Sequence, residues 1–314
     1  MKIKDLRDFI DRECRIDVAI VVNVTEGKSS KGSKYLSLTL QDSTGTIEAK
    51  KWEVSPSDEA TLALKKVVCI EGYPLIYNGS QLQFKITDVE PVSSYNEEDL
   101  ILTSPVDRKI LMERFMNYVD SIEDNSIKTI VSEIVLNKYN KLLLHPAAKT
   151  NHHEYAGGLL HHEVSMLDLA KQIASLYPSI NKDLLYGGII LHDLGKIIEL
   201  SGPIATEYTL KGKLLGHISI IQTDIVEVAK KHNIDDETVT LLQHMILSHH
   251  GKLEYGSPVL PLILEAEVMY LIDNMDSKIV MINKALKDVE VGGNSIRVMG
   301  LDGRSFYKHS KSNN

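Results

Sequence analysis

Residues 185–196 have the sequence LYGGIILHDLGK, which places the pair His192-Asp193 directly after an almost wholly apolar run. The pair therefore lies at the buried end of a predicted core helix. An aspartate is costly to bury without a partner, so buried carboxylates are usually paired or bound to metal. A surface turn or a helix C-terminus is the alternative for an isolated His-Asp pair, but this apolar setting favours a metal site.

More histidines and aspartates extend this motif. His217 precedes an apolar stretch, Asp273 lies in an apolar helical face, and His249-His250 closes a predicted helix. The alternative for His217 is a core histidine, and the alternative for Asp273 is a carboxylate that caps a neighbouring helix. For His249-His250 it is a favourable interaction with the C-terminus of their helix. Such ligands suit Mn, Mg, Fe or Zn, and two such ions can activate water and clamp a phosphate, which predicts a hydrolase. The candidate ligands are His162, His192, Asp193, His217, His249, His250 and Asp273.

Length and composition are those of an ordinary globular protein with room for two domains. The 314 residues are 43% hydrophobic and 25% charged, and the net charge of −8 excludes a global basic field. The first residues lack the apolar run of a signal peptide, and no stretch reaches the ~18 apolar residues of a membrane span. Cys14 and Cys69 are too few for a metal cluster and fit a reducing compartment. We expect a cytoplasmic protein without a membrane partner.

The N-terminal part shows the pattern of short strands. Residues 35–41 alternate between leucines and polar residues, Asn78-Gly79 is a strong hairpin turn, and a short helix is predicted over residues 57–66. Five strands with a helix between the third and the fourth is the order of an OB-fold, a Greek-key barrel. The predicted strands cover residues 18–25, 35–41, 46–52, 67–75 and 82–89.

Beyond the strands the periodicity becomes helical. We predict a multidomain α+β chain, with a five-stranded OB-fold β-barrel over residues 1–90 and an all-α domain over 107–288. Residues 91–106 form the expected linker and residues 289–314 a C-terminal tail. Apart from a helix that starts near residue 107, the predicted helices lie near 125–140, 158–177, 182–199, 213–231, 235–248 and 259–286.

Strand parity predicts a surface for single-stranded nucleic acid on the barrel. Tyr35 and Trp52 both project from the polar side of their strands, Trp52 on the same side as Lys50. Bases stack on such aromatic rings, and cationic side chains follow the phosphate backbone. The alternative is that Trp52 packs on the helical domain and that the lysines are merely solvated. The lysines of the preceding loop are Lys28, Lys31 and Lys34.

The motif of residues 191–196, with its upstream histidine, downstream double histidine and late aspartate, resembles the HD superfamily of metal-dependent phosphohydrolases. The OB-fold and HD domain together resemble the YhaM-type 3′-to-5′ exoribonucleases of Gram-positive bacteria over nearly the whole chain. The resemblance implies a dinuclear site in which Asp193 bridges two ions and is catalytic with Lys196, which steadies a phosphate oxygen or the leaving group. It assigns His162, His192, Asp193 and Asp273 to one ion, and His217, His249 and His250 to the other.

The chain departs from the family pattern at two positions. The usual run is Gly-Gly-Leu-Leu-Glu-His, and His161 stands at the glutamate position, so His161 and His162 compete as ligand, with His162 favoured. Gly158 stands where relatives that act in cyclic-dinucleotide signalling carry a glutamate, which makes a weaker second site an open alternative. Further candidate contacts to substrate are His152 and His153, for which a surface loop is the alternative, His161, and Arg304 in the tail.

Together these features predict a metal-dependent exoribonuclease that degrades single-stranded RNA to nucleoside 5′-monophosphates, with single-stranded DNA as a second substrate. Two divalent ions are expected, Mn first, with Mg, Fe or Zn as alternatives. A nucleotide or cyclic-dinucleotide phosphohydrolase is a second hypothesis, although a small ligand needs no oligonucleotide platform. A non-enzymatic single-strand or replication-associated DNA-binding protein is the third. The sequence does not decide the oligomeric state, and a homo-oligomer is one option.

Overall fold

The computed structural model describes residues 1–30, 32–77, 81–102, 104–148, 153–287 and 289–311. The chain divides into two compact units, residues 1–103 with 203–206 and residues 104–202 with 207–314. Residues 91–102, expected in the linker, group with the first unit, so the predicted domain limits stay a proposal. Within the described residues, no helix has the length and apolar character needed to cross a membrane.

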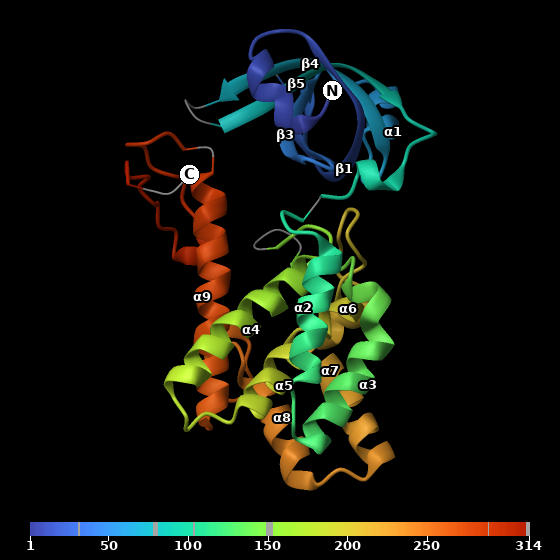
Figure 1. Ribbon diagram of the computed structural model, residues 1–314. Coiled ribbons are helices and arrows are strands. Elements are labelled where there is room, and N and C mark those ends of the chain that lie inside the picture. The colour runs from blue at the N-terminus through green and yellow to red at the C-terminus, as the bar shows by residue number, and fades with distance from the viewer. Residues whose placement is uncertain (31, 78–80, 103, 149–152, 288, 312–314) are drawn as a thin grey trace. The chain divides into compact units, whose positions relative to one another are not determined.

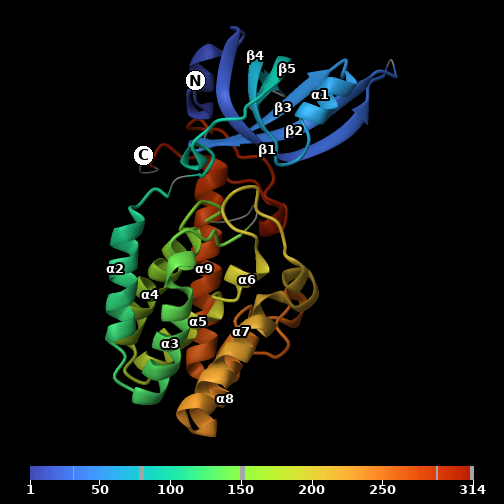
Figure 2. The ribbon, with the colours of Figure 1, turned by 90° about the vertical axis from the view of Figure 1, so that its right-hand side faces the viewer.

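The first unit is a closed five-stranded barrel with the strand order β1-β2-β3-β5-β4, in which β3 and β5 are parallel (Figures 1 and 2). This confirms the predicted OB-fold, and the short helix α1 (Pro56–Thr61) lies between β3 and β4 as expected. The hairpin turn predicted at Asn78-Gly79 lies outside the described residues, although β4 and β5 pair up to Tyr77 and Gln81 on either side. The strands are β1 (Cys14–Lys28), β2 (Lys34–Asp42), β3 (Gly45–Trp52), β4 (Val67–Tyr77) and β5 (Gln81–Pro91), and η1 (Ile3–Phe9) precedes them.

The barrel interior is filled by the alternating apolar residues that the sequence shows. Leu36, Leu38 and Leu40 of β2 are buried, as is Phe84 of β5. Their polar neighbours along each strand face outward, because successive side chains of a strand point to opposite sides. The inward face thus fixes the register that presents Tyr35 and Trp52 on the outside.

The second unit is helical, which confirms the other half of the predicted architecture (Figures 1 and 2). One predicted helix is broken: residues 182–199 form α5 and α6, separated by Asp193, Leu194 and Gly195. Another begins at Leu264 instead of residue 259, because Pro261 disfavours helical geometry in the residue before it. The helices are α2 (Arg108–Asp120), α3 (Asn125–Leu142), α4 (Gly158–Leu176), α5 (Lys182–His192), α6 (Lys196–Glu199), α7 (Leu210–His232), α8 (Asp236–Ser248) and α9 (Leu264–Leu286), with short 3-10 helices η2 (Glu97–Asp99), η3 (Leu253–Tyr255) and η4 (Met299–Leu301).

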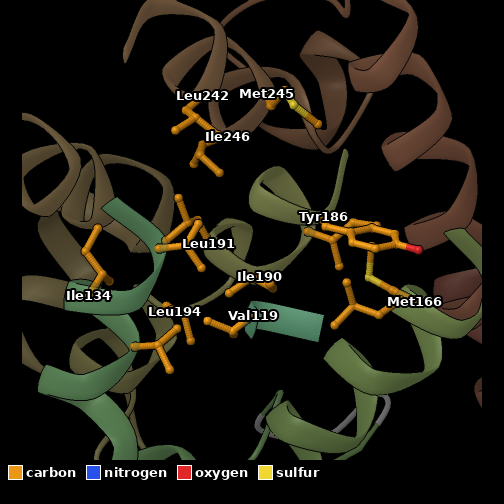
Figure 3. Packing of buried hydrophobic residues seen from close by; sticks show 14 of the residues in the cluster. Val119, Ile134, Met166, Tyr186, Ile190, Leu191, Leu194, Leu242, Met245 and Ile246 are labelled. Atoms are coloured by element: carbon orange, nitrogen blue, oxygen red, sulfur yellow. The ribbon is translucent and has the colours of Figure 1, made fainter. Parts of the chain in front are cut away.

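Helix α5 is the centre of this unit. Every residue from Leu184 to His192 is buried, and α3, α4, α8 and α9 all contact the helix. Figure 3 shows Ile190 and Leu191 of α5 among side chains of neighbouring helices. The apolar run that the sequence displays therefore carries His192 and Asp193 into the interior of the helical unit.

Candidate metal centre

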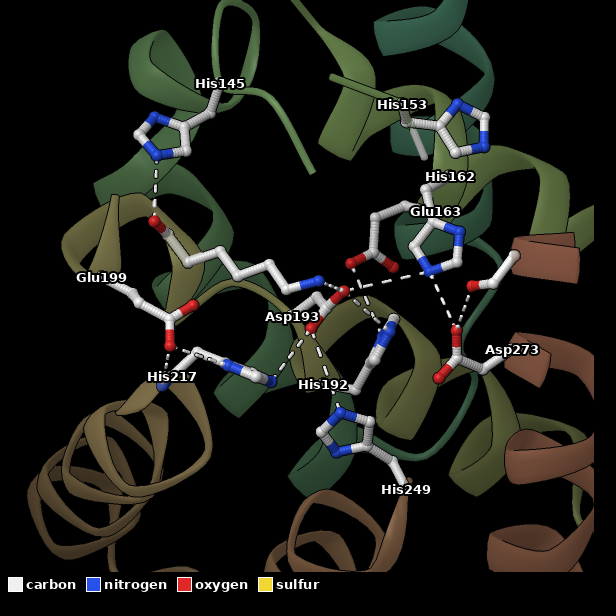
Figure 4. A network of polar contacts seen from close by, with 12 residues as sticks. His145, His153, His162, Glu163, His192, Asp193, Glu199, His217, His249 and Asp273 are labelled. Carbon is white, nitrogen blue, oxygen red and sulfur yellow. Dashed lines mark hydrogen bonds and ion pairs between the residues drawn. The ribbon is translucent and has the colours of Figure 1, made fainter. Parts of the chain in front are cut away.

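Asp193 follows the last residue of α5 and lies in the middle of a group of histidines (Figure 4). Its Oδ2 atom is 3.3 Å from His192 Nε2 and 3.9 Å from His162 Nε2. Its Oδ1 atom is 3.4 Å from His217 Nε2 and 4.0 Å from His249 Nε2. The two oxygens of one carboxylate thus face two different sets of histidines.

The first set lies between α4, α5 and α9. Potential ligand atoms of His162, His192 and Asp193 all lie within 4.8 Å of one another. Asp273 of α9 joins them, with its Oδ1 atom 3.3 Å from His162 Nε2. His162 and His192 are fully buried, whereas the side chain of Asp273 is 18% exposed.

The second set lies between α7 and the end of α8. Potential ligand atoms of His217, His249 and His250 also lie within 4.8 Å of one another. His217 enters this set because α7 loses its helical geometry at Gly216 (φ 71°, ψ 158°). Gly195 permits the close approach of the two segments, since a Cβ atom there would lie 2.2 Å from the His217 carbonyl oxygen.

Backbone carbonyls orient three of the rings. His192 Nδ1 donates to the Ile189 carbonyl and His249 Nδ1 to the Ile246 carbonyl, both at 2.7 Å. His250 Nδ1 donates to the Tyr255 carbonyl at 2.8 Å. A histidine whose Nδ1 carries the proton presents its Nε2 lone pair, which is the usual arrangement around a bound metal.

Carboxylates that the sequence analysis missed orient the other two rings. His162 Nδ1 contacts Asp276 Oδ2 at 2.7 Å, and His217 Nδ1 contacts Glu199 Oε1 at 3.2 Å. Asp276 lies three residues after Asp273 on α9, and that helical spacing was the available signal. Glu199 carries no comparable signal, because none of the predicted ligands lies on its own helix α6.

Glu163, next to His162, is a further buried acid that the sequence analysis missed. It is fully buried, and neither carboxyl oxygen makes a hydrogen bond within the described part of the chain. Its Oε1 atom is 3.6 Å from His192 Nδ1. Burial raises the pKa of Glu163 to about 8, so the group is mostly protonated at neutral pH.

The carboxylates of the centre dominate its electrostatics. Burial alone would lower the pKa of both His162 and His192, but neighbouring carboxylates reverse the direction. Asp273 and Asp276 raise the pKa of His162 to about 10, and Asp193 raises that of His192 to about 9. The same contacts lower the pKa of Asp193 and Asp273, although burial opposes this. The environment thus favours positive charge, and a divalent cation that binds the two rings displaces their protons.

The donor atoms fit a bound cation. The Nε2 atoms of His192 and His217 and the Oδ1 atom of Asp193 are buried and make no hydrogen bond with any described residue. Buried polar atoms are rarely left in this state without a bound ion or water. Imidazole nitrogens and carboxylate oxygens are the ligands that divalent first-row ions and Mg accept.

Lys196 lies beside this centre at the start of α6. Its Nζ atom donates to Asp193 Oδ2 at 2.7 Å, and Asp193 in turn raises the pKa of the lysine despite burial. The backbone carbonyl of Lys196 is 2.9 Å from His145 Nε2, which anchors the segment. The ammonium group is therefore held within reach of anything bound at Asp193.

The histidines near the start of α4 differ in whether their side chains point into the ligand cluster. Only His162 of the adjacent pair points into the cluster, while His161 Nδ1 contacts the Tyr155 hydroxyl at 2.6 Å. His153 is buried, and its Nε2 atom is 3.1 Å from Asp276, so the alternative of an exposed loop is wrong for this residue. His153 therefore packs behind His162, a position that does not favour direct contact with substrate. His152 lies outside the described residues.

Arg304 lies in the tail, where it is exposed. Its Nε donates to the Leu301 carbonyl at 3.0 Å, and its guanidinium lies 5.5 Å from the ring centroid of Phe306. These contacts hold the residue locally within residues 301–306. Its role as a substrate contact stays a prediction.

On the barrel, Tyr35 and Trp52 are paired across β2 and β3, with ring centroids 4.7 Å apart. Lys50 lies 5.7 Å from the Tyr35 ring, 5.9 Å from the Trp52 ring and 5.3 Å from that of Tyr77, an exposed aromatic that the sequence analysis missed. Lys34 is less available than expected, because it forms ion pairs with Glu26 and Glu59 at 3.0 and 2.8 Å. Lys28 is exposed, and Lys31 is not among the described residues.

Two family models match the two units. Residues 18–92 match the OB-fold nucleic acid binding domain, and residues 159–278 match the HD domain. The chain is 45% identical over 292 residues to the 3′-5′ exoribonuclease YhaM of Bacillus subtilis (strain 168), which covers 92% of this chain and 93% of that protein. This chain belongs to the YhaM family of 3′-5′ exoribonucleases. It is accordingly a hydrolase that acts on phosphodiester bonds.

A second relative agrees with this assignment. The 3′-5′ exoribonuclease YhaM of Geobacillus sp. (strain WCH70) is 44% identical over 298 residues, which cover 94% of this chain and 92% of that protein. Among solved structures, the second OB-fold domain of replication protein A from Methanococcus maripaludis is 20% identical. The match covers 31% of this chain and 97% of that domain, with a TM-score of 0.25.

Replacing Asp276 by asparagine should weaken metal binding without removing any of the seven predicted ligands. The amide keeps the size of the side chain but loses the charge that orients His162. Loss of such an outer carboxylate typically costs about 10- to 100-fold in metal affinity. Isothermal titration calorimetry with Mn measures the affinity of both proteins. An unchanged affinity would contradict the orienting role.

Proposed function

We propose that this chain is a metal-dependent 3′-5′ exoribonuclease that removes nucleotides from single-stranded RNA at a centre of two divalent ions. The observation that carries the proposal is the position of Asp193, whose two oxygens face two separate histidine sets at 3.3–4.0 Å. A carboxylate with one oxygen toward each set could bridge two cations at the ~3.5–4 Å spacing that is usual in two-metal sites.

The residues divide between the two ions accordingly. His162, His192, Asp193 and Asp273 would hold one ion. Asp193 would also reach the second ion, which His217, His249 and His250 complete. The mixture of imidazole and carboxylate ligands, without a thiolate, would accept Mn, and Mg, Fe or Zn are alternatives.

When bound, such an ion pair supplies a nucleophilic water near neutral pH and charge that stabilises the transition state. The residues of the chain provide the position. Asp193 fixes the centre, and Lys196, whose ammonium is 2.7 Å from Asp193 Oδ2, would contact a non-bridging phosphate oxygen or the leaving oxygen. The products would be nucleoside 5′-monophosphates. Hydrolysis of the bond between phosphorus and the 3′ oxygen leaves the phosphate on the 5′ oxygen of the released nucleotide.

The barrel would hold the RNA. Tyr35, Trp52 and Tyr77 offer exposed or half-buried rings around the cationic Lys50, which suits stacked bases and a phosphate backbone. Stacking needs no 2′-hydroxyl, so single-stranded DNA would serve as a second substrate.

Replacing Trp52 by alanine should weaken RNA binding while hydrolysis of a dinucleotide is retained. Loss of one stacking partner costs ~1–3 kcal/mol, which corresponds to about 5- to 150-fold in affinity. Fluorescence anisotropy with a labelled 15-nucleotide RNA, in the presence of chelator, measures binding alone. The exposed Tyr95, which lies outside the strands, provides the matched control as Tyr95→Ala. Equal affinities for the Trp52 and Tyr95 variants would contradict the assigned surface.

A time course with 5′-labelled RNA tests the proposed function directly. After chelation and addition of Mn, the wild type should produce a ladder that shortens by one nucleotide at a time from the 3′ end. Parallel reactions with free nucleotides and cyclic dinucleotides examine the alternative substrates. Faster hydrolysis of these small compounds than of the RNA would overturn the proposal, as would release of internal fragments.

A further inference from the structure

Helix α9 has an apolar stripe that, apart from Val268, does not pack against the hydrophobic core of the helical unit. Leu264, Leu271, Met275 and Ile279 are 47%, 54%, 40% and 49% exposed. The half-buried Val268, Ile282 and Leu286 continue the series at spacings of three or four residues. We call these seven residues the α9 stripe: Leu264, Val268, Leu271, Met275, Ile279, Ile282 and Leu286.

The α9 stripe lies beside the face of the helix that serves the core. Ala266, Met269 and Ile272 are buried in the hydrophobic core, and Asp276 is buried against His162. At 3.6 residues per turn, the stripe occupies a neighbouring sector about 80° wide. A continuous row of exposed apolar side chains on a helix marks a surface where another molecule binds.

The order of residues in the stripe makes it complementary to itself. Met275 is the centre of the stripe, and its other members lie at equal distances in the sequence on either side. Leu271 and Ile279 are four residues away, Val268 and Ile282 seven, and Leu264 and Leu286 eleven. Two antiparallel α9 helices with a two-fold axis at Met275 therefore place an apolar residue opposite every apolar residue. Such an isologous contact is the commonest kind in homo-oligomers.

Charge favours the antiparallel over the parallel arrangement. Lys278 borders the stripe and is exposed. A parallel pair in register would bring the two Lys278 side chains together, whereas the antiparallel pair separates them by six residues, about 9 Å along the axis. The helix dipoles also oppose each other only in the antiparallel pair.

The apolar surface extends past both ends of the helix. Leu260 and Leu262 are exposed before α9, and Val291 and Ile296 are exposed after it. In an antiparallel pair the segment before one helix approaches the segment after the other. A helix of 23 residues is about 35 Å long. These flanking residues would help to reach the ~800 Å² per partner that stable dimers bury.

We propose that this face binds a second copy of the same chain, with α9 paired antiparallel about Met275. The pairing would clamp the helix that carries Asp273 and Asp276, so the oligomer would support the centre from outside. Oligomerisation is measured without reference to hydrolysis, so this proposal and the proposed function can fail independently.

Sedimentation velocity of the full-length protein tests the stoichiometry. At micromolar concentration the wild type should sediment with twice the mass of one chain. Met275→Glu places two like charges at the axis and should weaken association by at least 100-fold, while Leu136→Glu, at an exposed leucine of α3, should not. A monomeric wild type would overturn the proposal, as would equal behaviour of the two variants with unchanged thermal melts.

Cross-linking tests the geometry in the correctly folded dimer, even if Met275→Glu does not fold. Met275→Cys should form an intermolecular disulfide on mild oxidation, and the wild type, with Cys14 and Cys69, gives the background. Leu271→Cys alone should not cross-link, since its copy would be about 12 Å away along the axis, beyond the reach of a disulfide. Leu271→Cys mixed with Ile279→Cys should. Cross-linking of Leu271→Cys with itself, or none at position 275, would overturn the antiparallel pairing.

Discussion

Replacing Asp193 by asparagine should reduce the rate of RNA hydrolysis by about 10³-fold or more. The amide keeps the shape of the side chain but removes the charge that faces both histidine sets. Metal ions supply several kcal/mol of stabilisation to the transition state, and each 1.36 kcal/mol corresponds to a factor of about ten in rate. Initial rates on 5′-labelled RNA at saturating Mn measure the loss.

The control for this prediction is Asp88→Asn, at an exposed aspartate of β5. It changes the net charge by the same amount and should leave the rate within about twofold. A thermal melt shows whether the Asp193 variant is folded. A folded Asp193→Asn protein with more than about a tenth of the wild-type rate would contradict the bridging role.

Replacing His250 by alanine should halve the metal content and lower the rate by about 100-fold or more. His250 is half-buried, whereas His249 is fully buried, and the one hydrogen bond of His250 among the described residues goes to the Tyr255 carbonyl, so its removal should disturb packing less than that of His249. The wild type should bind two Mn per chain and show the exchange-coupled spectrum of a close pair by electron paramagnetic resonance. The variant should show the six-line spectrum of isolated Mn.

The surface histidine His232 of α7 gives the matched control, because it is exposed, is paired with Glu133 and belongs to neither ligand set. His232→Ala should retain two Mn per chain. If His250→Ala also retained two coupled ions at full occupancy, the second set would not be a binding site as assigned. A wild type with a single ion and full activity would equally refute the dinuclear centre.

Local patterns determine much of this fold from the sequence. Strict alternation in residues 35–41 fixes which side of β2 is buried, and therefore that Tyr35 faces outward. The apolar run before His192 requires a buried helix, and a buried helix carries its terminal polar pair inward. The break between α5 and α6 was missed, because the apolar spacing continues through Leu194 and Ile197 while the backbone changes direction.

Partners that come from distant segments could not be predicted in this way. Glu199 orients His217 only because α6 and α7 pack together. Lys34 forms an ion pair with Glu59 of α1. Tyr77 joins the aromatic group through the pairing of β4 with β5, a register that neither strand reveals alone. Each of these contacts joins residues of different helices or strands. The periodicity of a single helix or strand therefore does not predict it.

Anomalous diffraction from crystals grown with Mn tests the central claim most directly. Two anomalous peaks about 3.5–4 Å apart are expected, the usual spacing of two-metal sites, one beside Asp193 Oδ2 and the other beside Asp193 Oδ1. The first peak should contact His162, His192 and Asp273, and the second His217, His249 and His250. One peak alone, or two peaks that do not share Asp193, would contradict the account.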